Sequence, residues 1–366
     1  MSYIKGLVAA SFAAAVSMGS AVAQEEKVLH VYNWSDYIAE DTVANFEKET
    51  GIKVVYDVFD SNEVLEAKLL AGNTGFDIVV PSSDFLARQI QAGVFQQLDK
   101  KQLPNLKNMD AGTMKLLADK DPDNAHSMPY LGGTTGIGFN PKKVAAVMGP
   151  DFKLDSWDAV LKPENLSKLK KCGVSFLNAP TEIMATVLHY IGKDPNSTNP
   201  DDYKDAGKVL TSLRPYISYF HSSQYINDLA NGDICVAIGW SGDVMQAAKR
   251  AKEAKNGVAV DYVIPKEGAL VFYDMLAIPA DAKHPENAHA FINYLMRPEV
   301  IAKVSNYVSY ASGNAASLPM VDESIRNNPN IYPPAELKAK MFTLKVLPAK
   351  INREITREWT KVKTGK

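Results

Sequence analysis

The sequence lacks several features that would assign it to a broad functional class. Its 40 lysine and arginine residues are balanced by 42 aspartate and glutamate residues, so it has no excess of positive charge for binding nucleic acid or an anionic membrane surface. Beyond residue 23, no uncharged apolar stretch reaches the roughly 20 residues of a membrane-spanning helix. We therefore expect a soluble protein that does not bind nucleic acid.

Motifs for cofactors and catalysis are also incomplete. The Gly-Ile-Gly segment at 136–138 has no third glycine at the spacing of a dinucleotide-binding loop. The segment 239–242 partly matches a nucleophile elbow, but Asp243 takes the place of its final glycine. The 6 histidines show no metal-ligand spacing. The sequence therefore predicts no cofactor, no metal and no catalysis, with a hydrolase or an amine-processing enzyme as the alternative.

The first 23 residues have the pattern of an export signal. Lys5 is their only charge, an apolar stretch runs from Gly6 to about Val16, and small residues at 21–23 provide a cleavage site. The mature chain is therefore expected to begin at Gln24. About 340 residues remain, more than one hydrophobic core usually organises, so we expect two domains.

Cysteine is scarce, with only 2 residues, Cys172 and Cys235. In an exported protein, an even number of cysteines favours a disulfide, and a bridge between these two would close a long loop. Two free, buried thiols are the alternative. A disulfide would place both residues in the same domain.

Apolar and amphipathic segments alternate along the chain, which is the pattern of an α/β fold. Strands joined through helices in this way form a mostly parallel sheet. The first part is expected to hold strands at 28–32, 52–58 and 77–80 and helices at 38–50 and 60–71. The second is expected to hold strands at 173–177 and 234–238 and helices at 183–191 and 244–252.

Three further segments organise these parts. The glycine-rich segment 132–140 is expected to be extended and to cross between the domains. The segment 269–278 is expected to be another strand. The tail at 333–365 has the pattern of amphipathic helices that dock on one of the domains.

The clearest functional hint lies at the end of the apolar run 234–238. Trp240 and Asp243 follow that run, at a turn from a strand into a helix. Open α/β sheets bind ligands at the carboxyl ends of their strands, and a large aromatic face beside a carboxylate suits an organic cation. The alternative is that Asp243 caps the helix while Trp240 packs in a core.

The same combination of ring and acid recurs elsewhere. Phe272 and Asp274 are two positions apart and therefore project from one face of their strand, where an acid is unusual unless it is paired. Together, the repeated pairs predict a slot with aromatic walls and carboxylates near its ends, which suits a flexible polycation. The other residues of this pattern are Trp34, Asp36 and Tyr37, with Glu182 as a lone acid and Ser82 as a polar neighbour.

At this point a resemblance can be identified. The segments 32–38, 56–64 and 241–244 resemble those of the polyamine-binding periplasmic proteins of ABC transporters, most closely the putrescine-binding branch. The resemblance covers the whole mature chain. It implies two α/β lobes of the type II periplasmic binding protein fold, joined by hinge crossings, with the ligand in the cleft between them.

The resemblance also implies boundaries, partners and site residues. Lobe 1 would comprise residues 24–135 and 264–309, and lobe 2 residues 136–263 and 310–366. The protein would be a periplasmic monomer that delivers putrescine or a related polyamine to a membrane permease and its ATPase. The family's pair of cysteines corresponds to Cys172 and Cys235, which supports the disulfide. The implied ligand-binding residues are Ser35, Asp36, Ser82 and Asp274 around one amine, Glu182 and Asp243 toward the other, and the walls Trp34, Tyr37, Trp240, Phe272 and Tyr310.

Some positions depart from the family pattern. Gly132 and Gly133 stand where relatives commonly carry a tryptophan, which predicts a roomier pocket, and Ser312-Gly313-Asn314 replaces the usual Asn-Pro-Asn. Relatives that prefer spermidine carry a tryptophan near position 272, where this chain has Phe272. Spermidine and agmatine are therefore alternative ligands, and a polyamine-sensing subunit is an alternative to a transport subunit.

Overall fold

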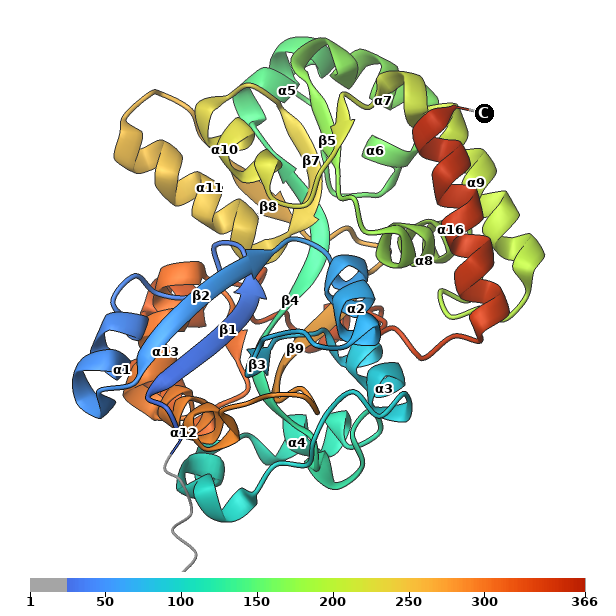
Figure 1. The fold of residues 1–366 in the computed structure, drawn as a ribbon. Coiled ribbons are helices and arrows are strands. Elements are labelled where there is room, and N and C mark those ends of the chain that lie inside the picture. Colours follow the sequence, from blue (N-terminus) through green and yellow to red (C-terminus); the bar gives the residue numbers. More distant parts are fainter. Residues whose placement is uncertain (1–24, 366) are drawn as a thin grey trace, which may run out of the picture.

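The chain folds into two α/β halves, one above the other in Figure 1. The computed structural model describes residues 25–365, and the predicted export signal at 1–23 lies outside them. The lower half contains the first strands of the chain, and the upper half contains most of residues 140–264 and the C-terminal helix. This arrangement agrees with the predicted α/β fold of two lobes.

A single mixed sheet runs through both halves. Its strand order is β2-β1-β3-β9-β4-β7-β5-β6, and β8 and β10 each pair with β4. Pairing is parallel within β2-β1-β3 and within β7-β5-β6, as predicted, but β9 and β4 run antiparallel to their neighbours. The strands are β1 (Val28–Trp34), β2 (Lys53–Phe59), β3 (Ile78–Val79), β4 (Ser127–Phe139), β5 (Val174–Phe176), β6 (Tyr219–Phe220), β7 (Val236–Trp240), β8 (Asp261–Val263), β9 (Val271–Ala277) and β10 (Ala311–Ser312).

The long strand β4 connects the two halves. Residues 127–134 of β4 pair with β9, whereas residues 135–139 pair with β7. The glycine-rich segment predicted to cross between domains forms most of this strand, which runs from the lower into the upper half (Figure 1). The change of partner occurs between Thr134 and Thr135, beside the predicted lobe boundary, and β10 pairs with the part of β4 that also contacts β9.

Helices cover the sheet in both halves. One continuous cluster of buried apolar side chains extends through the two halves. The helices are α1 (Thr42–Thr50), α2 (Asn62–Ala71), α3 (Ser83–Gln91), α4 (Ala111–Leu117), α5 (Pro141–Met148), α6 (Asp158–Leu161), α7 (Pro163–Leu169), α8 (Pro180–Tyr190), α9 (Pro200–Leu213), α10 (Gln224–Asn231), α11 (Ser241–Ala254), α12 (Pro285–Leu295), α13 (Pro298–Val308), α14 (Glu323–Arg326), α15 (Ala335–Lys338) and α16 (Ala349–Thr364).

The first helix begins later than its apolar spacing indicates. We predicted a start at Ile38, but α1 begins at Thr42, after a turn in which Asp36 has a φ of 55°. The predicted end is correct, since Gly51 has a φ of 71° and its N–H caps the carbonyl of Glu47.

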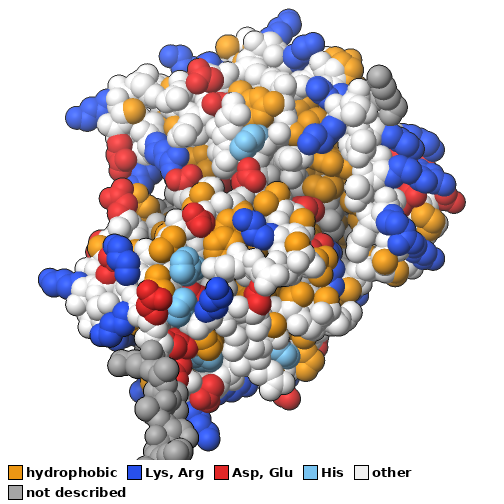
Figure 2. Space-filling view, viewed as in Figure 1, with side chains coloured by type: hydrophobic (Ala, Val, Ile, Leu, Met, Phe, Trp, Pro, Cys, Tyr) orange, Lys and Arg blue, Asp and Glu red, His pale blue; other side chains and the backbone are white. Residues whose placement is uncertain are grey.

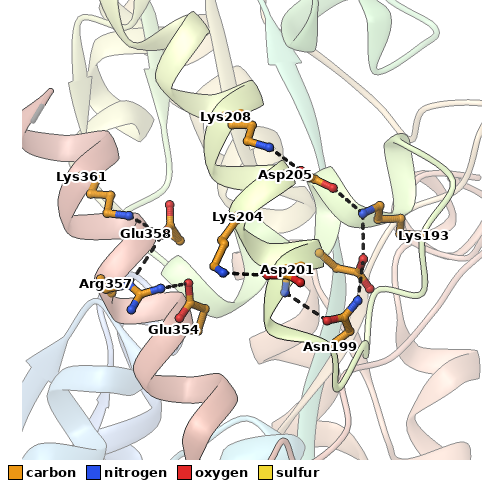
Figure 3. A network of polar contacts seen from close by, with 11 residues as sticks. Lys193, Asn199, Asp201, Lys204, Asp205, Lys208, Glu354, Arg357, Glu358 and Lys361 are labelled. Atoms are coloured by element: carbon orange, nitrogen blue, oxygen red, sulfur yellow. Dashed lines mark hydrogen bonds and ion pairs between the residues drawn. The ribbon is translucent and has the colours of Figure 1, made fainter.

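The predicted docking of the tail occurs through α16, which packs on α8 and α9 of the upper half. Its apolar face is buried, and the indole N–H of Trp359 donates to the side-chain oxygen of Asn178 at 3.2 Å. The charged side chains form ion pairs within each helix or with the adjoining loop, as for Lys193 with Asp205 at 2.7 Å (Figure 3). Apolar packing therefore joins the two helices.

Three other predictions concern the whole chain. Cys172 and Cys235 form a disulfide, so the alternative of two free thiols is wrong. In the part of the chain that the structure describes, no helix has both the length and the apolar character needed to cross a bilayer. Both signs of charge are interspersed over the face drawn in Figure 2.

Candidate functional site

A cavity lies where the two halves meet. It has an empty volume of about 430 Å³, which includes space open to solvent. Of the eleven predicted ligand-binding residues, ten line it, and Asp36 is the exception. The lining residues are Trp34, Ser35, Tyr37, Phe59, Asp60, Asn62, Ser82, Glu182, Ser222, Trp240, Asp243, Phe272, Asp274 and Tyr310.

Strand ends bring these residues together. Trp34 ends β1, Phe59 ends β2 and Trp240 ends β7, so three carboxyl ends of strands meet at the cavity. This is where open α/β sheets place ligands. Phe272 and Asp274 lie in β9 and both line the cavity, as their spacing predicted.

Aromatic rings form the walls and contact one another edge to face. The rings of Trp34 and Trp240 are 5.5 Å apart with an interplanar angle of 78°, so they meet from opposite halves. Phe272 lies 6.3 Å from Trp240 and 6.1 Å from Tyr310. Tyr37 completes the series at 5.0 Å from Tyr310. Such contacts hold each ring in one orientation, so the aromatic faces around the cavity are preorganised.

Asp274 is buried at one side of the cavity and has two hydroxyl partners. Ser82 Oγ donates to its Oδ1 at 2.6 Å, and Tyr37 Oη donates to its Oδ2 at 2.7 Å. Burial raises the pKa of Asp274 to about 7, because neutral hydroxyl groups compensate a buried negative charge only in part.

Asp243 has a matching environment. Tyr310 Oη donates to Oδ1 at 2.7 Å and Tyr225 Oη donates to Oδ2 at 2.8 Å, and burial raises the pKa of Asp243 to about 7. The alternative role as a helix cap is wrong, because Trp240 is the N-cap of α11 and the carboxylate of Asp243 accepts the two tyrosine hydroxyls. Trp240 is largely buried, as that alternative also expected, but it lines the cavity.

Glu182, in the first turn of α8, is a third carboxylate of the lining, which also includes Asp60. It accepts the indole N–H of Trp240 at 2.9 Å and the hydroxyl of Thr135. Burial raises the pKa of Glu182 to about 7. The partners of all three carboxylates are thus neutral donors, and each carboxylate would gain from a cation in the cavity.

Asp36 lies outside this cavity lining. Its carboxylate pairs with Arg250 at 2.6 Å, and its carbonyl accepts the side-chain N–H of Gln246 at 3.2 Å. Both partners lie on α11 of the upper half, whereas Asp36 belongs to the lower half. In this structure, Asp36 therefore bridges the two halves beside the cavity.

Four lining residues were missed in the sequence: Phe59, Asp60, Asn62 and Ser222. Phe59 is the last residue of β2, Asp60 and Asn62 follow it, and Ser222 follows the end of β6, so the rule of strand carboxyl ends could have identified them. Asn62 was assigned only to a helix start. In the structure, its side chain also exchanges hydrogen bonds with Ser82, which in turn holds Asp274.

The hollow continues beyond Glu182. A second hollow shares Trp34, Trp240 and Glu182 with the first and extends to Glu63 and Asp84. Burial raises the pKa of Glu63 to about 7, and it also raises the pKa of Asp84. Space and acidic groups therefore extend past the end of the first cavity.

Two glycines allow the rings to pack closely. A Cβ at Gly242 would lie 2.2 Å from the ring of Tyr310, so only glycine lets that tyrosine reach Asp243. A Cβ at Gly133 would lie 2.7 Å from the ring of Tyr310 and 2.8 Å from that of Phe272. These rings occupy the place of a side chain at 133, and the roomier pocket stays a prediction.

Known proteins resemble the chain over nearly its full length. The putrescine-binding periplasmic protein PotF of Escherichia coli (strain K12) is 64% identical over 365 residues, covering 100% of this chain and 98% of that protein. The putrescine-binding periplasmic protein SpuD of Pseudomonas aeruginosa (strain UCBPP-PA14) is 58% identical over 362 residues, covering 99% and 98%.

A solved structure and a family model agree with these matches. The spermidine/putrescine ABC transporter substrate-binding protein PotD of Streptococcus pneumoniae has a TM-score of 0.73 at 25% identity, covering 93% of this chain and 99% of that one. This likeness confirms the predicted two-lobe fold. Residues 41–333 match the family model described as bacterial extracellular solute-binding protein. The chain belongs to the bacterial extracellular solute-binding protein family.

Proposed function

We propose that this protein captures putrescine or a closely related polyamine in the periplasm and delivers it to an ABC importer. The observation that carries the proposal is a set of three carboxylates inside aromatic walls, the buried Asp243 and Asp274 and the half-buried Glu182, whose hydrogen-bond partners are all neutral. The relatives named for putrescine binding support the same ligand class.

The chemistry of the cavity matches a flexible diamine. Each ammonium group of such a ligand donates charge-assisted hydrogen bonds, which are roughly twice as strong as neutral ones. The methylene chain between them gains from burial against aromatic faces, which also attract cations. We assign one ammonium group to Asp274 with Ser82 and the other to Asp243 and Glu182. Trp34, Tyr37, Trp240, Phe272 and Tyr310 form the walls.

Charge balance also favours a dication over a monocation. Asp243 and Asp274 are held by separate tyrosines from separate elements, so each offers its own anchoring point. A ligand with one charge would leave one of these buried carboxylates without a cationic partner, which costs free energy.

Closure of the lobes around the ligand would follow from this arrangement. Trp34 and Trp240 approach from opposite halves, and Asp36 and Arg250 pair across the same interface. A ligand that contacts both halves stabilises the form in which they meet. We propose that a membrane permease and its ATPase recognise this form, and that the binding protein acts as a monomer.

A longer amine is the second candidate ligand. The extension of the hollow past Glu182 to Glu63 and Asp84 favours it, because a third ammonium group or a guanidinium group would meet further carboxylates there. Spermidine and agmatine are therefore the alternatives to putrescine. Putrescine and the longer amines would occupy the same cavity, but only the longer amines would also gain affinity from the hollow beyond Glu182.

Calorimetric titration of the mature protein with putrescine, cadaverine, agmatine and spermidine tests the proposal. We expect saturable binding of at least one of them with a stoichiometry of one. If none of the four produces heat of binding or a thermal shift, the proposal is wrong. Asp57→Asn provides a matched control, because that acid is exposed and lies outside the cavity.

Transport and sensing require a separate experiment. We expect deletion of the gene to abolish high-affinity uptake of radiolabelled putrescine by cells, and the wild-type gene to restore it. Uptake that is unchanged while transporter levels are held constant would instead support a sensing role.

A further inference from the structure

Two histidines and an aspartate meet in the lower half, away from the cavity. His30 lies in β1, Asp77 directly precedes β3, and His284 directly precedes α12. Asp77 Oδ2 lies 3.0 Å from Nδ1 of His284 and 3.4 Å from Nδ1 of His30. One potential metal ligand atom from each residue lies within 4.8 Å of the other two.

Backbone hydrogen bonds hold the carboxylate of Asp77 in place. The N–H groups of Lys283 and His284 donate to Oδ1 at 3.0 and 2.9 Å, and the N–H of His30 donates to Oδ2 at 2.9 Å. The Asp77 side chain is only 2% exposed. Three segments that are distant in sequence are therefore fixed around one carboxylate, and both imidazole rings are directed at the same oxygen.

This combination of ligand atoms suits a particular class of metal. Imidazole nitrogen and carboxylate oxygen together are ligands of Zn²⁺ and similar divalent transition metals, whereas Ca²⁺ and Mg²⁺ prefer oxygen alone. Zn²⁺ takes nitrogen at about 2.0–2.1 Å and oxygen at about 2.0–2.2 Å, so ligand atoms of one site lie roughly 3.3 Å apart. The observed 3.0 and 3.4 Å separations are close to that spacing, and the two rings would have to turn from the oxygen of Asp77 toward a shared metal ion.

We propose that His30, Asp77 and His284 form a site for Zn²⁺ or a similar divalent transition metal. The two Nδ1 atoms and Oδ2 of Asp77 would be the protein ligands. The ring of His30 is 35% exposed and that of His284 is 12% exposed, so solvent reaches the site and water can supply the fourth ligand. Binding would displace the Nδ1 protons from the neutral rings or compete with their protonation, so affinity should fall as pH falls.

Other histidines provide a comparison. His126 Nδ1 lies 2.9 Å from the buried carboxylate of Asp121, but within residues 25–365 no third possible ligand joins this pair. A single histidine beside a carboxylate is the usual arrangement for a hydrogen bond that orients a ring. The cluster at Asp77 differs because two imidazole rings, those of His30 and His284, contact the same carboxylate oxygen.

A metal at this site would affect the stability of the lower lobe and not the binding of the polyamine. His30 is four residues before Trp34 in the same strand, which places them about 13 Å apart. A metal held there would join β1 to α12, which contact each other in the lower half (Figure 1). We therefore expect it to stabilise this lobe while leaving polyamine affinity unchanged.

Zinc titration of the untagged mature protein tests this proposal. After dialysis against a chelator, we expect calorimetry with ZnCl₂ to give one site and Zn²⁺ to raise the melting temperature. His30→Gln and His284→Gln should each weaken Zn²⁺ binding at least tenfold, whereas His126→Gln should bind Zn²⁺ like the wild type. Asp77 is left unchanged because three backbone N–H groups depend on it.

The outcomes separate the two interpretations. If the wild type binds no Zn²⁺, or if the double variant of His30 and His284 binds it as tightly as the wild type, the cluster is only a hydrogen-bonded junction. Circular dichroism and putrescine titration of each variant show whether the lobes still fold. Loss of Zn²⁺ binding in a variant that has kept its fold and its polyamine affinity supports the metal site.

Discussion

The acidic side chains of the cavity differ from those on the outer helices of the upper half. On α9, Asp205 pairs with Lys193 and Lys208, and these hydrogen bonds lower its pKa to about 2. In the cavity, Asp243 and Asp274 have hydroxyl partners, and burial raises their pKa to about 7. The aspartate on α9 therefore already has cationic partners, whereas the two cavity aspartates have only neutral ones and would gain from a bound cation.

The hydrogen-bond partners of an acidic side chain therefore identify a cation-binding site better than the number of acidic residues does. An exposed ion pair contributes little to stability and gains little from an added cation, because water already screens its charge. A buried carboxylate held by tyrosine hydroxyls is prepared for a cation, since its hydrogen bonds orient it without neutralising it.

The largest expected effect is that of pH. The pKa values of Asp243, Asp274 and Glu182 are about 7, above the ordinary values of 3.8 and 4.5. A bound dication requires the ionised carboxylates, so lowering the pH from 8 to 6 should weaken putrescine binding about tenfold for each carboxylate that must lose a proton. Calorimetry in buffers of different ionisation enthalpy should detect proton release on binding below pH 7.

The sign for the ligand-free protein is the opposite. Because the folded pKa values exceed the unfolded ones, these three groups stabilise the ligand-free fold most below about pH 4, and that contribution is lost as the pH rises through 7. Acids such as Asp205, with a pKa of about 2, do not titrate in this range. Affinity and proton release that stay constant between pH 6 and 8 would contradict our account of the cavity.

Removing one cavity carboxylate should have the next largest effect. Asp243→Asn or Asp274→Asn replaces a charge-assisted hydrogen bond by a neutral one, which costs about 1.5–3 kcal/mol and raises the Kd of putrescine by roughly 10–150-fold. Asp205→Asn on α9 should leave the Kd unchanged. Equal effects of all three variants, measured by calorimetry, would contradict the distinction between the two regions.

Gly242→Ala should disturb the cavity without changing any charge. The added Cβ would lie 2.2 Å from the ring of Tyr310, so the ring must move and weaken its hydrogen bond to Asp243. Overpacking of this kind costs about 1–3 kcal/mol of folding stability. We expect a lower melting temperature and weaker putrescine binding, and Gly257→Ala, at a position with open space but a φ of 77°, controls for the loss of a glycine. Wild-type affinity in Gly242→Ala would contradict the role of this packing.

Local patterns in the sequence predicted most of the elements and most of the cavity. Trp34 and Trp240 end apolar strands, and Phe272 and Asp274 share a strand face, so these local patterns predicted that they would line one site. Hydrogen bonds such as Tyr37 to Asp274 join residues 237 positions apart, and no local pattern contains them. The same holds for His30, Asp77 and His284, which come from three separate segments.

Backbone conformation is another feature that local patterns do not contain. Asp36 stands beside Trp34 and Tyr37 in the sequence, and both this proximity and the family resemblance grouped it with the cavity. Its φ of 55° belongs to the turn after β1, and its carboxylate meets Arg250 from the other half. A role for Asp36 in binding the ligand stays a prediction.

The smallest expected effect tests that role. Arg250 and Asp36 form a half-exposed pair, and such pairs are typically worth up to about 1 kcal/mol, so Arg250→Ala should raise the Kd of putrescine about twofold to fivefold by weakening contact between the halves. If Asp36 acts only through Arg250, Asp36→Asn should have a similar effect and the double variant should be no worse than either single variant. If Asp36 also binds an ammonium group, Asp36→Asn should cost as much as Asp243→Asn and should do so even when Arg250 is already alanine. Calorimetry on the four proteins of this cycle therefore decides whether Asp36 belongs with the paired acids of the surface or with the carboxylates of the cavity.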